Sequence, residues 1–341
     1  MTKTKNSLCI LIIGMIQLSG HADMPTEGLI AYYPFDGSAL DQSPNGNDGF
    51  PVGPILTTDR TNNPASAYAF DGVDDFIRIF QTASMQPQLP MTVSVWLQRG
   101  PGGSAVAPIF ANNFTQDFYT GISLRLSQVA TISFGDGGPT TPGSRRSYAG
   151  ITPIAEGEWV HISAVLRGPT DMKLFVNGAE ECGTYSGNGG ALAYNANEAA
   201  VGRYDISQLT NENYYSGKID ELSFYSRGLN AFEIAQLAGL SQDVDGDSIA
   251  NEADNCMSNP NPSQVDSDSD GFGNACDADL NNDNTINIVD LGLLRAAFFA
   301  TPGAGNWNAS ADLDANGVVN VVDLGLMRSR FFCPPGPSGL N

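Results

Sequence analysis

Oxygen-bearing side chains recur at fixed spacing in four twelve-residue stretches of the C-terminal third of the chain. A calcium ion takes six to eight oxygen ligands, and a twelve-residue loop supplies them from positions 1, 3, 5, 7, 9 and 12, with a backbone carbonyl at position 7. The spacing therefore predicts four calcium loops and several bound Ca²⁺ ions. The predicted ligands are Asp243, Asp245, Asp247, Asn251 and Asp254 in the first loop; Asp266, Asp268, Asp270, Asn274 and Asp277 in the second; Asp279, Asn281, Asp283, Thr285, Asn287 and Asp290 in the third; and Asp312, Asp314, Asn316, Val318, Asn320 and Asp323 in the fourth.

A single acidic run of this kind is as often a solvated or disordered segment as a metal site. Four runs in the same register favour metal, because converging carboxylates repel at a cost on the order of 1 kcal/mol per pair even in a watery environment. Position 6 of such a loop turns sharply and favours glycine. Gly271 and Gly317 meet this requirement, Asn284 can adopt the left-handed conformation at some cost, and Ser248 makes the first loop the least regular.

The charge distribution excludes nucleic acid as a partner. The net charge is −21, and the 16 Lys and Arg residues are scattered, whereas a phosphate-binding surface needs them clustered. Residues 243–341 hold fifteen acids and three bases, so the composition changes sharply near residue 241. We place the main domain boundary there.

The N-terminus reads as a secretory signal peptide, residues 1–22, with lysines, a short apolar run and small residues before Asp23. No other run approaches the roughly 20 apolar residues of a membrane helix, so we expect no membrane span. Removal of Cys9 with the signal leaves Cys182, Cys256, Cys276 and Cys333, an even number suited to an oxidising compartment. The expected location is extracellular, either secreted or at the cell surface.

Residues 23–240 contain short apolar strands separated by Gly, Pro, Asn and Asp, which is typical of an all-β sandwich. The Asn177-Gly178 pair predicts a hairpin turn. One short helix is expected after Asn230, with Glu233 as the capping-box partner. The predicted strands are 67–70, 76–80, 92–97, 159–166 and 173–176.

Acidic residues of this region do not form a catalytic array. A retaining glycanase needs two carboxyl groups about 5 Å apart on one sheet face. Glu156 and Glu158 flank a turn, and Asp220 and Glu221 point to opposite faces of a strand. His161 alternates with apolar residues in a strand, which favours a structural role over a catalytic one.

Candidate ligand-binding residues in the sandwich are aromatic. Trp96 and Trp159 lie in apolar strand patterns and read as core. The tyrosines on predicted loops are better candidates, namely Tyr119, Tyr148, Tyr204, Tyr214 and Tyr215. The loop of residues 36–48, with Asp41 and Asn45, is a further candidate cation site.

Three strings in this region, beginning at Gly28, Ser66 and Gly217, carry a family resemblance. They are Gly-Leu-Ile-Ala-Tyr-Tyr-Pro-Phe-Asp-Gly, Ser-Ala-Tyr-Ala-Phe-Asp-Gly-Val-Asp-Asp and Gly-Lys-Ile-Asp-Glu-Leu-Ser-Phe-Tyr-Ser-Arg. Together they resemble the laminin G-like, concanavalin A-like jelly-roll family. The resemblance implies two antiparallel sheets packed face to face, a fold that hosts carbohydrate binding, protein adhesion and passive spacer roles.

Residues 241–278, with the first two loops and Cys256 and Cys276, resemble a thrombospondin type 3 repeat. In that family, ions and disulfides replace a core, and the resemblance implies a Cys256–Cys276 bridge worth roughly 3 kcal/mol. Four cysteines allow three connectivities, so the pairing of Cys182 and Cys333 stays open.

Residues 279–333 form an internal duplication, because the segment from Asn287 to Arg295 recurs from Asn320 to Arg328 and each copy ends in a Phe pair. This duplication is similar to the type I dockerin family, a small α-helical EF-hand-like domain with two calcium loops. Leu291, Leu294 and Phe298, with their counterparts Leu324, Met327 and Phe331, fall at helical spacing and read as a small shared core. Residues 334–341 form a tail.

The dockerin resemblance implies a cohesin partner, facing Ile288, Val289, Val321 and Val322 together with Arg295 and Arg328. Dockerins of cellulose-degrading complexes usually carry small hydroxyl residues at the first pair. The apolar pairs here could instead bury against the other half of the domain or against a different protein.

The sequence therefore predicts a secreted, calcium-binding, non-catalytic protein. Its sandwich would recognise a glycan or an extracellular protein, and its calcium region would act as a stiff spacer and docking element. The alternative is a glycan hydrolase or an accessory component of a polysaccharide-degrading complex.

Overall fold

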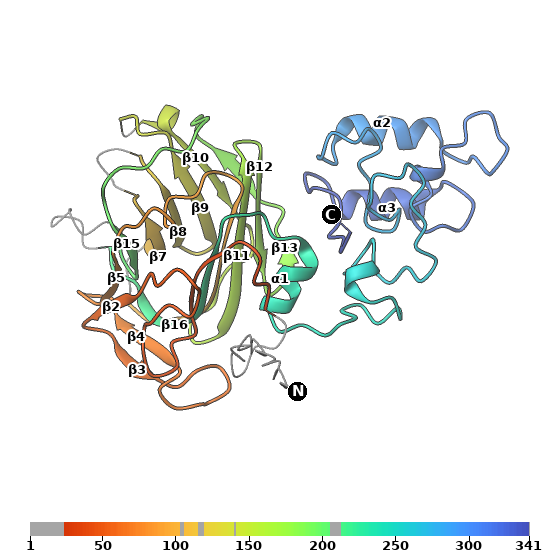
Figure 1. The fold of residues 1–341 in the computed structure, drawn as a ribbon. Coiled ribbons are helices and arrows are strands. Elements are labelled where there is room, and N and C mark those ends of the chain that lie inside the picture. Colours follow the sequence, from red (N-terminus) through yellow and green to blue (C-terminus); the bar gives the residue numbers. More distant parts are fainter. Residues whose placement is uncertain (1–23, 103–105, 115–118, 140, 205–212, 341) are drawn as a thin grey trace, which may run out of the picture.

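The computed structural model describes residues 24–102, 106–114, 119–139, 141–204 and 213–340. The predicted signal peptide lies outside these residues. Figure 1 shows a β-sandwich followed by a separate, mostly irregular region that ends in two helices. The predicted fold class, a mainly β sandwich with a small helical C-terminal region, is confirmed.

The first sheet has eight strands, seven of them in the order β13-β12-β11-β6-β16-β4-β3, and β1 also pairs with β16. Its strands are β1 (Leu29–Tyr33), β3 (Ile55–Thr57), β4 (Ala67–Asp71), β6 (Met91–Arg99), β11 (Trp159–Gly168), β12 (Asp171–Val176), β13 (Ala179–Glu180) and β16 (Ser216–Tyr225).

The second sheet also has eight strands, in the order β14-β10-β9-β8-β7-β15-β5-β2, and its pairings are antiparallel like those of the first. Its strands are β2 (Gly49–Val52), β5 (Phe76–Ile79), β7 (Ala107–Asn112), β8 (Ile122–Leu126), β9 (Ala130–Gly135), β10 (Arg145–Ala149), β14 (Thr184–Ser186) and β15 (Ala199–Val201).

The main core lies between the sheets because side chains alternate between the two faces of each strand. In β6, Val93, Val95 and Leu97 point into this core. The intervening residues, such as Ser94 and Trp96, lie on the outer face of the first sheet. Sequence alternation therefore decides which face each strand buries.

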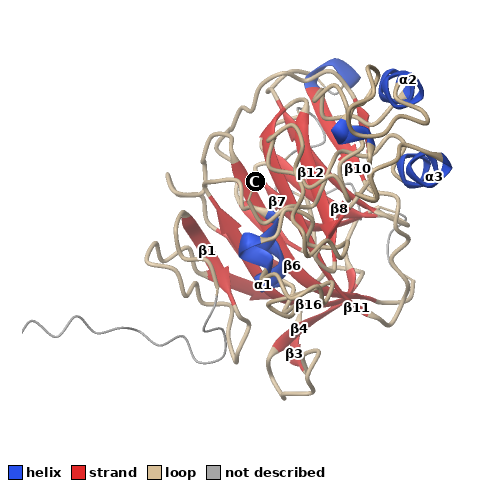
Figure 2. Cartoon of the chain, turned by 90° about the vertical axis from the view of Figure 1, so that its right-hand side faces the viewer, coloured by secondary structure: helices blue, strands red, loops and turns tan. Residues whose placement is uncertain are grey.

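The short helix α1 (Ala231–Leu237) covers part of that outer face (Figure 2). Asn230 accepts the amide of Glu233, and Glu233 accepts the amide of Asn230, so the predicted capping box is present. The predicted turn is also confirmed, since Asn177 and Gly178 both have positive φ between β12 and β13.

The C-terminal region contains two nine-residue helices, α2 (Ile288–Ala296) and α3 (Val321–Ser329), which lie side by side (Figure 2). Leu294 and Met327 are fully buried between them, and Leu291, Phe298, Leu324 and Phe331 pack against the same cluster. The predicted shared core of the duplication is therefore confirmed. Short 3₁₀ turns occur at Pro142–Ser144, Asn251–Ala253 and Ala309–Ala311.

Two contacts fasten the calcium region to the sandwich. Cys182, just after β13, forms a disulfide with Cys333. Met257 is buried in the cluster formed by α1 and the outer face of the first sheet, beside Val165 and Tyr225. None of the helices in the described ranges is long and apolar enough to cross a bilayer.

Candidate functional sites

The four predicted calcium loops share one backbone geometry. Position 6 has positive φ in every loop, including Ser248 at 75° and Asn284 at 64°. Its amide donates to the carboxylate at position 1 in each case. These distances are 3.0 Å from Ser248 to Asp243, 3.1 Å from Gly271 to Asp266, 2.5 Å from Asn284 to Asp279 and 2.8 Å from Gly317 to Asp312.

A second contact repeats in all four loops. The amide of position 7 donates to the side-chain oxygen at position 5, as from Ile249 to Asp247 at 2.8 Å and from Val318 to Asn316 at 2.8 Å. The equivalent contacts from Phe272 and Thr285 measure 2.8 Å and 3.1 Å. The backbone thus turns the side chains of positions 1 and 5 towards the centre of each loop.

Three of the loops gather carboxylate oxygens within 4.8 Å of one another: Asp243, Asp245 and Asp247; Asp266, Asp268 and Asp270; and Asp312, Asp314 and Asp323. The third loop has Asn281 at position 3 and the fourth has Asn316 at position 5, so each of these two donor sets has three acids, whereas the first and second loops have four. All-oxygen sets of this kind suit a hard divalent cation.

The first loop gives the sharpest indication that a cation belongs in these sites. Oδ2 of Asp245 and Oδ2 of Asp254 are buried, and neither has a hydrogen-bond partner in the described part of the chain. Burial raises the pKa of both carboxyl groups, and neighbouring carboxylates oppose ionisation further. Buried carboxylate oxygens without partners are costly, and a bound cation would satisfy them.

Asp277, at position 12 of the second loop, is also held in an unfavourable setting. Burial raises the pKa of its carboxyl group to about 8, with further contributions from Asp270, Asp268 and Asp279. A divalent ion would reverse this effect by stabilising the ionised form.

The asparagines at position 9 fall into two classes. Asn251 and Asn274 accept the amide at position 2 of their own loop, at 2.9 Å each. Asn287 and Asn320 instead cap α2 and α3 by accepting the amides of Val289 and Val322. In each case the side-chain oxygen accepts a backbone amide of the loop or of the helix. These four predicted ligands therefore fix the local backbone of their loops.

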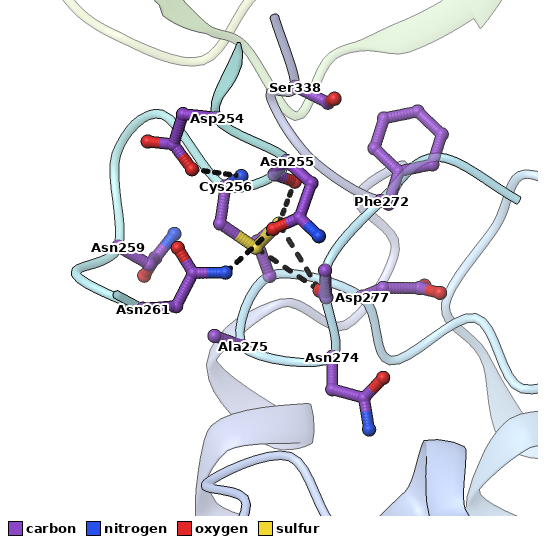
Figure 3. Close-up of a disulfide and its surroundings, with 12 residues drawn as sticks. Asp254, Asn255, Cys256, Asn259, Asn261, Phe272, Asn274, Ala275, Asp277 and Ser338 are labelled. Atoms are coloured by element: carbon purple, nitrogen blue, oxygen red, sulfur yellow. Dashed lines mark hydrogen bonds between the residues drawn. A yellow bond between two sulfur atoms is a disulfide. The ribbon is translucent and has the colours of Figure 1, made fainter. Parts of the chain in front are cut away.

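The first two loops meet at a buried disulfide between Cys256 and Cys276, so the implied pairing is confirmed. Asp254 Oδ1 accepts the amide of Cys256 at 2.8 Å, and Asn261 donates to Asn255 at 2.7 Å (Figure 3). The tail also packs here, because Ser338 donates to the carbonyl of Gly271 at 2.8 Å. The buried disulfide thus packs between the two predicted calcium loops, where few apolar side chains are available to form a core.

The predicted docking residues are exposed on the two helices, with the apolar pair at the start of each helix and the arginine in its last turn. Ile288 is 67% exposed and its counterpart Val321 is 68% exposed. Val289, Val322, Arg295 and Arg328 are exposed as well. The apolar pairs are therefore not buried against the other half of the domain, which removes one of the two alternatives.

Sequence reasoning missed an aromatic residue beside each apolar pair. Phe332 is 72% exposed, and its amide donates to the carbonyl of Ile286, two residues before Ile288. Phe299 is 77% exposed and bonds in the same way to Val319, two residues before Val321. The only signal was the repeated Phe pair, and nothing in it distinguishes the exposed ring from the buried one.

Acidic candidates for catalysis are dispersed over the sandwich. Glu156 and Glu158 are exposed in the turn before β11, and Glu156 lies 3.9 Å from Arg99. Asp220 is buried on the outer face of the first sheet, where burial and Glu221 raise its carboxyl pKa to about 8 and Arg60, 3.5 Å away, lowers it.

His161 is buried and bonds to Ser94, with 2.8 Å between Nε2 and Oγ. Its Nδ1 has no hydrogen-bond partner among the described residues. A nucleophilic serine needs a histidine oriented by a third group at that nitrogen. The Ser94–His161 pair is accordingly a structural contact under α1, where Trp96 packs 5.3 Å from the imidazole ring.

The candidate cation loop near residue 41 is organised by its own hydrogen bonds. Asp41 accepts the amides of Tyr32, Ser43 and Asn47 and the hydroxyl of Ser43. Elsewhere on the sandwich, Asp71, Asp74 and Asp75 lie close together, and Asp75 accepts the amide of Asp71 at 2.9 Å. This second grouping was not anticipated, and its bonds order the turn after β4.

The five tyrosine candidates separate clearly. Tyr148 and Tyr215 are buried, and their hydroxyls bond to the carbonyls of Glu181 and Gln98. Tyr119 and Tyr204 are partly exposed, and both pack against Phe114, with 5.7 Å between ring centres in each pair. Tyr214 lies 5.7 Å from the guanidinium of Arg203.

Three family models match this chain in the predicted order. Residues 70–235 match the concanavalin A-like lectin/glucanases superfamily, residues 241–264 the thrombospondin type 3 repeat, and residues 278–331 the dockerin type I domain. The three predicted resemblances are thereby confirmed. The last two are calcium-binding families. No curated protein sequence matches the chain.

Solved structures resemble the sandwich at low identity. Domain 4 of AbnA, a GH43 extracellular arabinanase from Geobacillus stearothermophilus in complex with arabinotriose, is 21% identical with a TM-score of 0.47, covering 63% of this chain and all of that one. The binding domain of Paraclostridial Mosquitocidal Protein 1 is 14% identical with a TM-score of 0.49, covering 62% of this chain and 52% of that one. At these scores we base no functional conclusion on either structure.

Proposed function

We propose that this chain is a secreted, calcium-binding, non-catalytic protein whose sandwich binds carbohydrate and whose duplicated helical domain docks onto a cohesin-like protein. The observation that carries the proposal is the geometry repeated in four loops, where backbone amides orient carboxylates around a common centre. The match to the dockerin type I domain supports the docking role, and the match to the concanavalin A-like superfamily supports the carbohydrate role.

Calcium would supply charge neutralisation in this arrangement. With ions bound, the carboxylates can approach without repulsion, and their loops fix where α2 and α3 begin. Asn287 and Asn320 then cap helices whose first residues are the exposed apolar pairs. The ions would therefore orient the exposed apolar pairs of α2 and α3 through the loops that precede each helix, and they would not need to contact the partner.

The calcium region would also hold the docking domain at a fixed distance from the sandwich. Arg330, after α3, donates to Asn259 Oδ1 at 3.0 Å and to the carbonyl of Ala275 at 2.5 Å. Met257 attaches residues 241–278 to the sandwich, and the Cys182–Cys333 disulfide attaches the end of the docking domain to it. These contacts support a stiff spacer.

The docking role is tested with the full calcium-loaded chain and a panel of immobilised cohesin domains, measured by biolayer interferometry. A chain with I288D, V289D, V321D and V322D should lose binding, because charged side chains would be desolvated at the contact. A matched control, L40D with V73D, changes exposed apolar residues of the sandwich and should bind normally. If no cohesin binds the calcium-loaded chain, the docking role is wrong.

The carbohydrate role is tested with a glycan array probed by the same chain in calcium. Binding to a defined group of polysaccharides supports it, whereas binding to extracellular proteins alone would assign the sandwich to protein recognition. Reducing sugar released from any bound polysaccharide, and lost in E156Q or E158Q, would instead make the chain an enzyme.

A further inference from the structure

The outer face of the second sheet carries a row of small side chains. Cross-strand pairing sets Ser147 of β10 opposite Ser133 of β9, Ser133 opposite Ser123 of β8, and Ser123 opposite Ala111 of β7. All four are buried. Residues paired in register lie on the same face of a sheet. These four small side chains therefore form one row across four strands of the second sheet.

Two arginines, Arg125 and Arg145, flank this row of small side chains. Arg125 follows Ser123 by two residues and Arg145 precedes Ser147 by two, so both share the outer face. Arg125 Nη1 donates to Ser133 Oγ at 2.9 Å. Arg145 lies 4.9 Å from the ring centre of Tyr119 and donates to its hydroxyl at 3.4 Å. Both arginines are partly buried residues.

Arg125 and Arg145 have no acidic partner among the described residues, where no carboxylate forms an ion pair with either guanidinium group. Arg145 Nε is buried and has no hydrogen-bond partner there. Burial lowers the pKa of Arg125, and the nearby charge of Arg145 acts in the same direction.

Arg78 provides the contrast, because it lies on the same outer face and pairs with Glu198 at 2.5 Å. Asp136, which follows β9, uses its Oδ1 for the amide of Gly138. Leaving two neighbouring cations unpaired is unfavourable unless an anion joins them. The chain has a net charge of −21, so acids to pair with them are plentiful in the sequence.

We propose that Arg125 and Arg145, with Tyr119 and Tyr204 beside them, bind the anionic group of an acidic glycan, either a uronate carboxylate or a sulfate ester. This inference rests on the proposed carbohydrate role and names the ligand class of the sandwich. Guanidinium groups donate in a planar fork that matches carboxylate and sulfate oxygens. The tyrosine rings offer flat apolar faces on which a sugar ring can pack, and their hydroxyls can form hydrogen bonds with it. A simple anion would gain nothing from the ring faces.

The test uses the full chain in a fixed calcium concentration and isothermal titration calorimetry. The probes are a linear oligomer of uronic acid, a sulfated oligosaccharide, a neutral oligosaccharide of equal length and an acidic peptide. R125Q and R145Q are the site variants, and R78Q is the matched control on the same sheet face. Thermal unfolding and near-ultraviolet circular dichroism identify any variant that fails to fold. If R125Q or R145Q fails to fold, Y119F takes its place in the titration, because it removes only the hydroxyl that accepts from Arg145.

We expect one acidic oligosaccharide to bind, with at least tenfold weaker binding by R125Q and by R145Q, unchanged binding by R78Q and reduced affinity at high salt. Whichever of the uronate and sulfate probes binds identifies the anion. Equal binding of the neutral oligosaccharide, or binding unaffected by R125Q and R145Q, overturns this inference and leaves the carbohydrate role intact. Binding of the acidic peptide alone overturns both, because the sandwich would then recognise protein.

Discussion

Cys182, in the sandwich, is disulfide-bonded to Cys333, which lies four residues after the end of α3, although 151 residues separate the two cysteines in sequence. The amide of Ile286, at position 8 of the third loop, donates to the carbonyl of the same Cys333 at 3.1 Å. The disulfide therefore joins the sandwich to the centre of the duplicated domain.

Replacing both cysteines in C182S/C333S should destabilise the chain. Closing a loop of this length constrains the unfolded state by about 5 kcal/mol in the chain-entropy model, which gives an upper bound. In the presence of calcium, the urea concentration at the midpoint of unfolding should decrease. In limited proteolysis, cleavage between residues 241 and 278 should be faster than in the native chain. An unchanged midpoint and cleavage rate would show that the packing of Met257 against the sandwich holds the two regions together without the disulfide.

The glycine at position 6 of the fourth loop gives a prediction about backbone conformation. A Cβ at Gly317 would meet nothing within 4 Å, but φ there is 85°. G317A should therefore lose about 1 kcal/mol of stability through backbone strain alone, with weaker calcium binding by the fourth loop. Calorimetric calcium titration and thermal unfolding measure both effects.

The matched control is G325A, in the middle of α3, where a Cβ also meets open space. Alanine is the better helix former by about 1 kcal/mol, so this variant should gain stability. Conversely, S248G should strengthen the first loop, because Ser248 already adopts φ of 75°. Equal effects of G317A and G325A would contradict the strain argument.

Local patterns were enough to predict much of this structure. Alternating apolar residues predicted β4, β5, β6, β11 and β12, the Asn177-Gly178 pair predicted the hairpin turn after β12, and Asn230 with Glu233 predicted α1. The oxygen spacing predicted the turns of the calcium loops, including the left-handed position 6. These features depend on neighbours within a few residues, so the sequence alone carries them.

Long-range contacts were beyond that reach. The Cys182–Cys333 pairing, the burial of Met257 against α1 and the contact of Ser338 with Gly271 join segments that no periodicity relates. The grouping of Arg125 with Arg145 depends on the register of β8, β9 and β10. The alternation of a strand predicts which face a residue occupies, but not which strand lies beside it.

Burial of His161 predicts an acid-sensitive sandwich. Burial lowers the pKa of its imidazole to about 3, whereas an unfolded histidine titrates near pH 6.5. The unfolded state thus binds the proton more readily, so this contribution to stability is complete above pH 6.5 and is lost as pH falls from there towards 3. At pH 4.5 the loss should approach about 3 kcal/mol.

The measurement compares urea unfolding of the native chain and H161Q at pH 7 and pH 4.5 in constant calcium. Subtracting the variant removes other titrating groups, notably Asp220, whose raised pKa favours the folded state as pH falls below 8. The native chain should lose more stability on acidification than H161Q does. Parallel losses would mean that His161 accepts a proton without unfolding.

Removing calcium should loosen the C-terminal region and leave the sandwich folded. The sandwich has its own core of apolar residues, whereas residues 241–278 contain one disulfide and two predicted calcium loops. A chelator should therefore expose residues 241–333 to protease while strands of the sandwich stay protected from hydrogen exchange. Calorimetric titration should count four ions, with dissociation constants of about 10⁻⁴ to 10⁻³ M for the weakest sites. Unchanged protease resistance in chelator would contradict the ion sites.

The second and fourth loops should bind calcium cooperatively, because Asn274 joins them. Its oxygen accepts the amide of Ser267 within the second loop, and its Nδ2 donates to the carbonyl of Ala309 at 2.8 Å, just before the fourth loop. N274A should weaken calcium binding at both loops, since each would lose a contact that fixes its first residues. Asn251 is the matched control, because its Nδ2 donates to Ser241 beside its own loop, so N251A should weaken the first loop alone. Titrations that report each loop through a nearby fluorophore separate the two patterns, and a fourth loop unaffected by N274A would show that the contact carries no coupling.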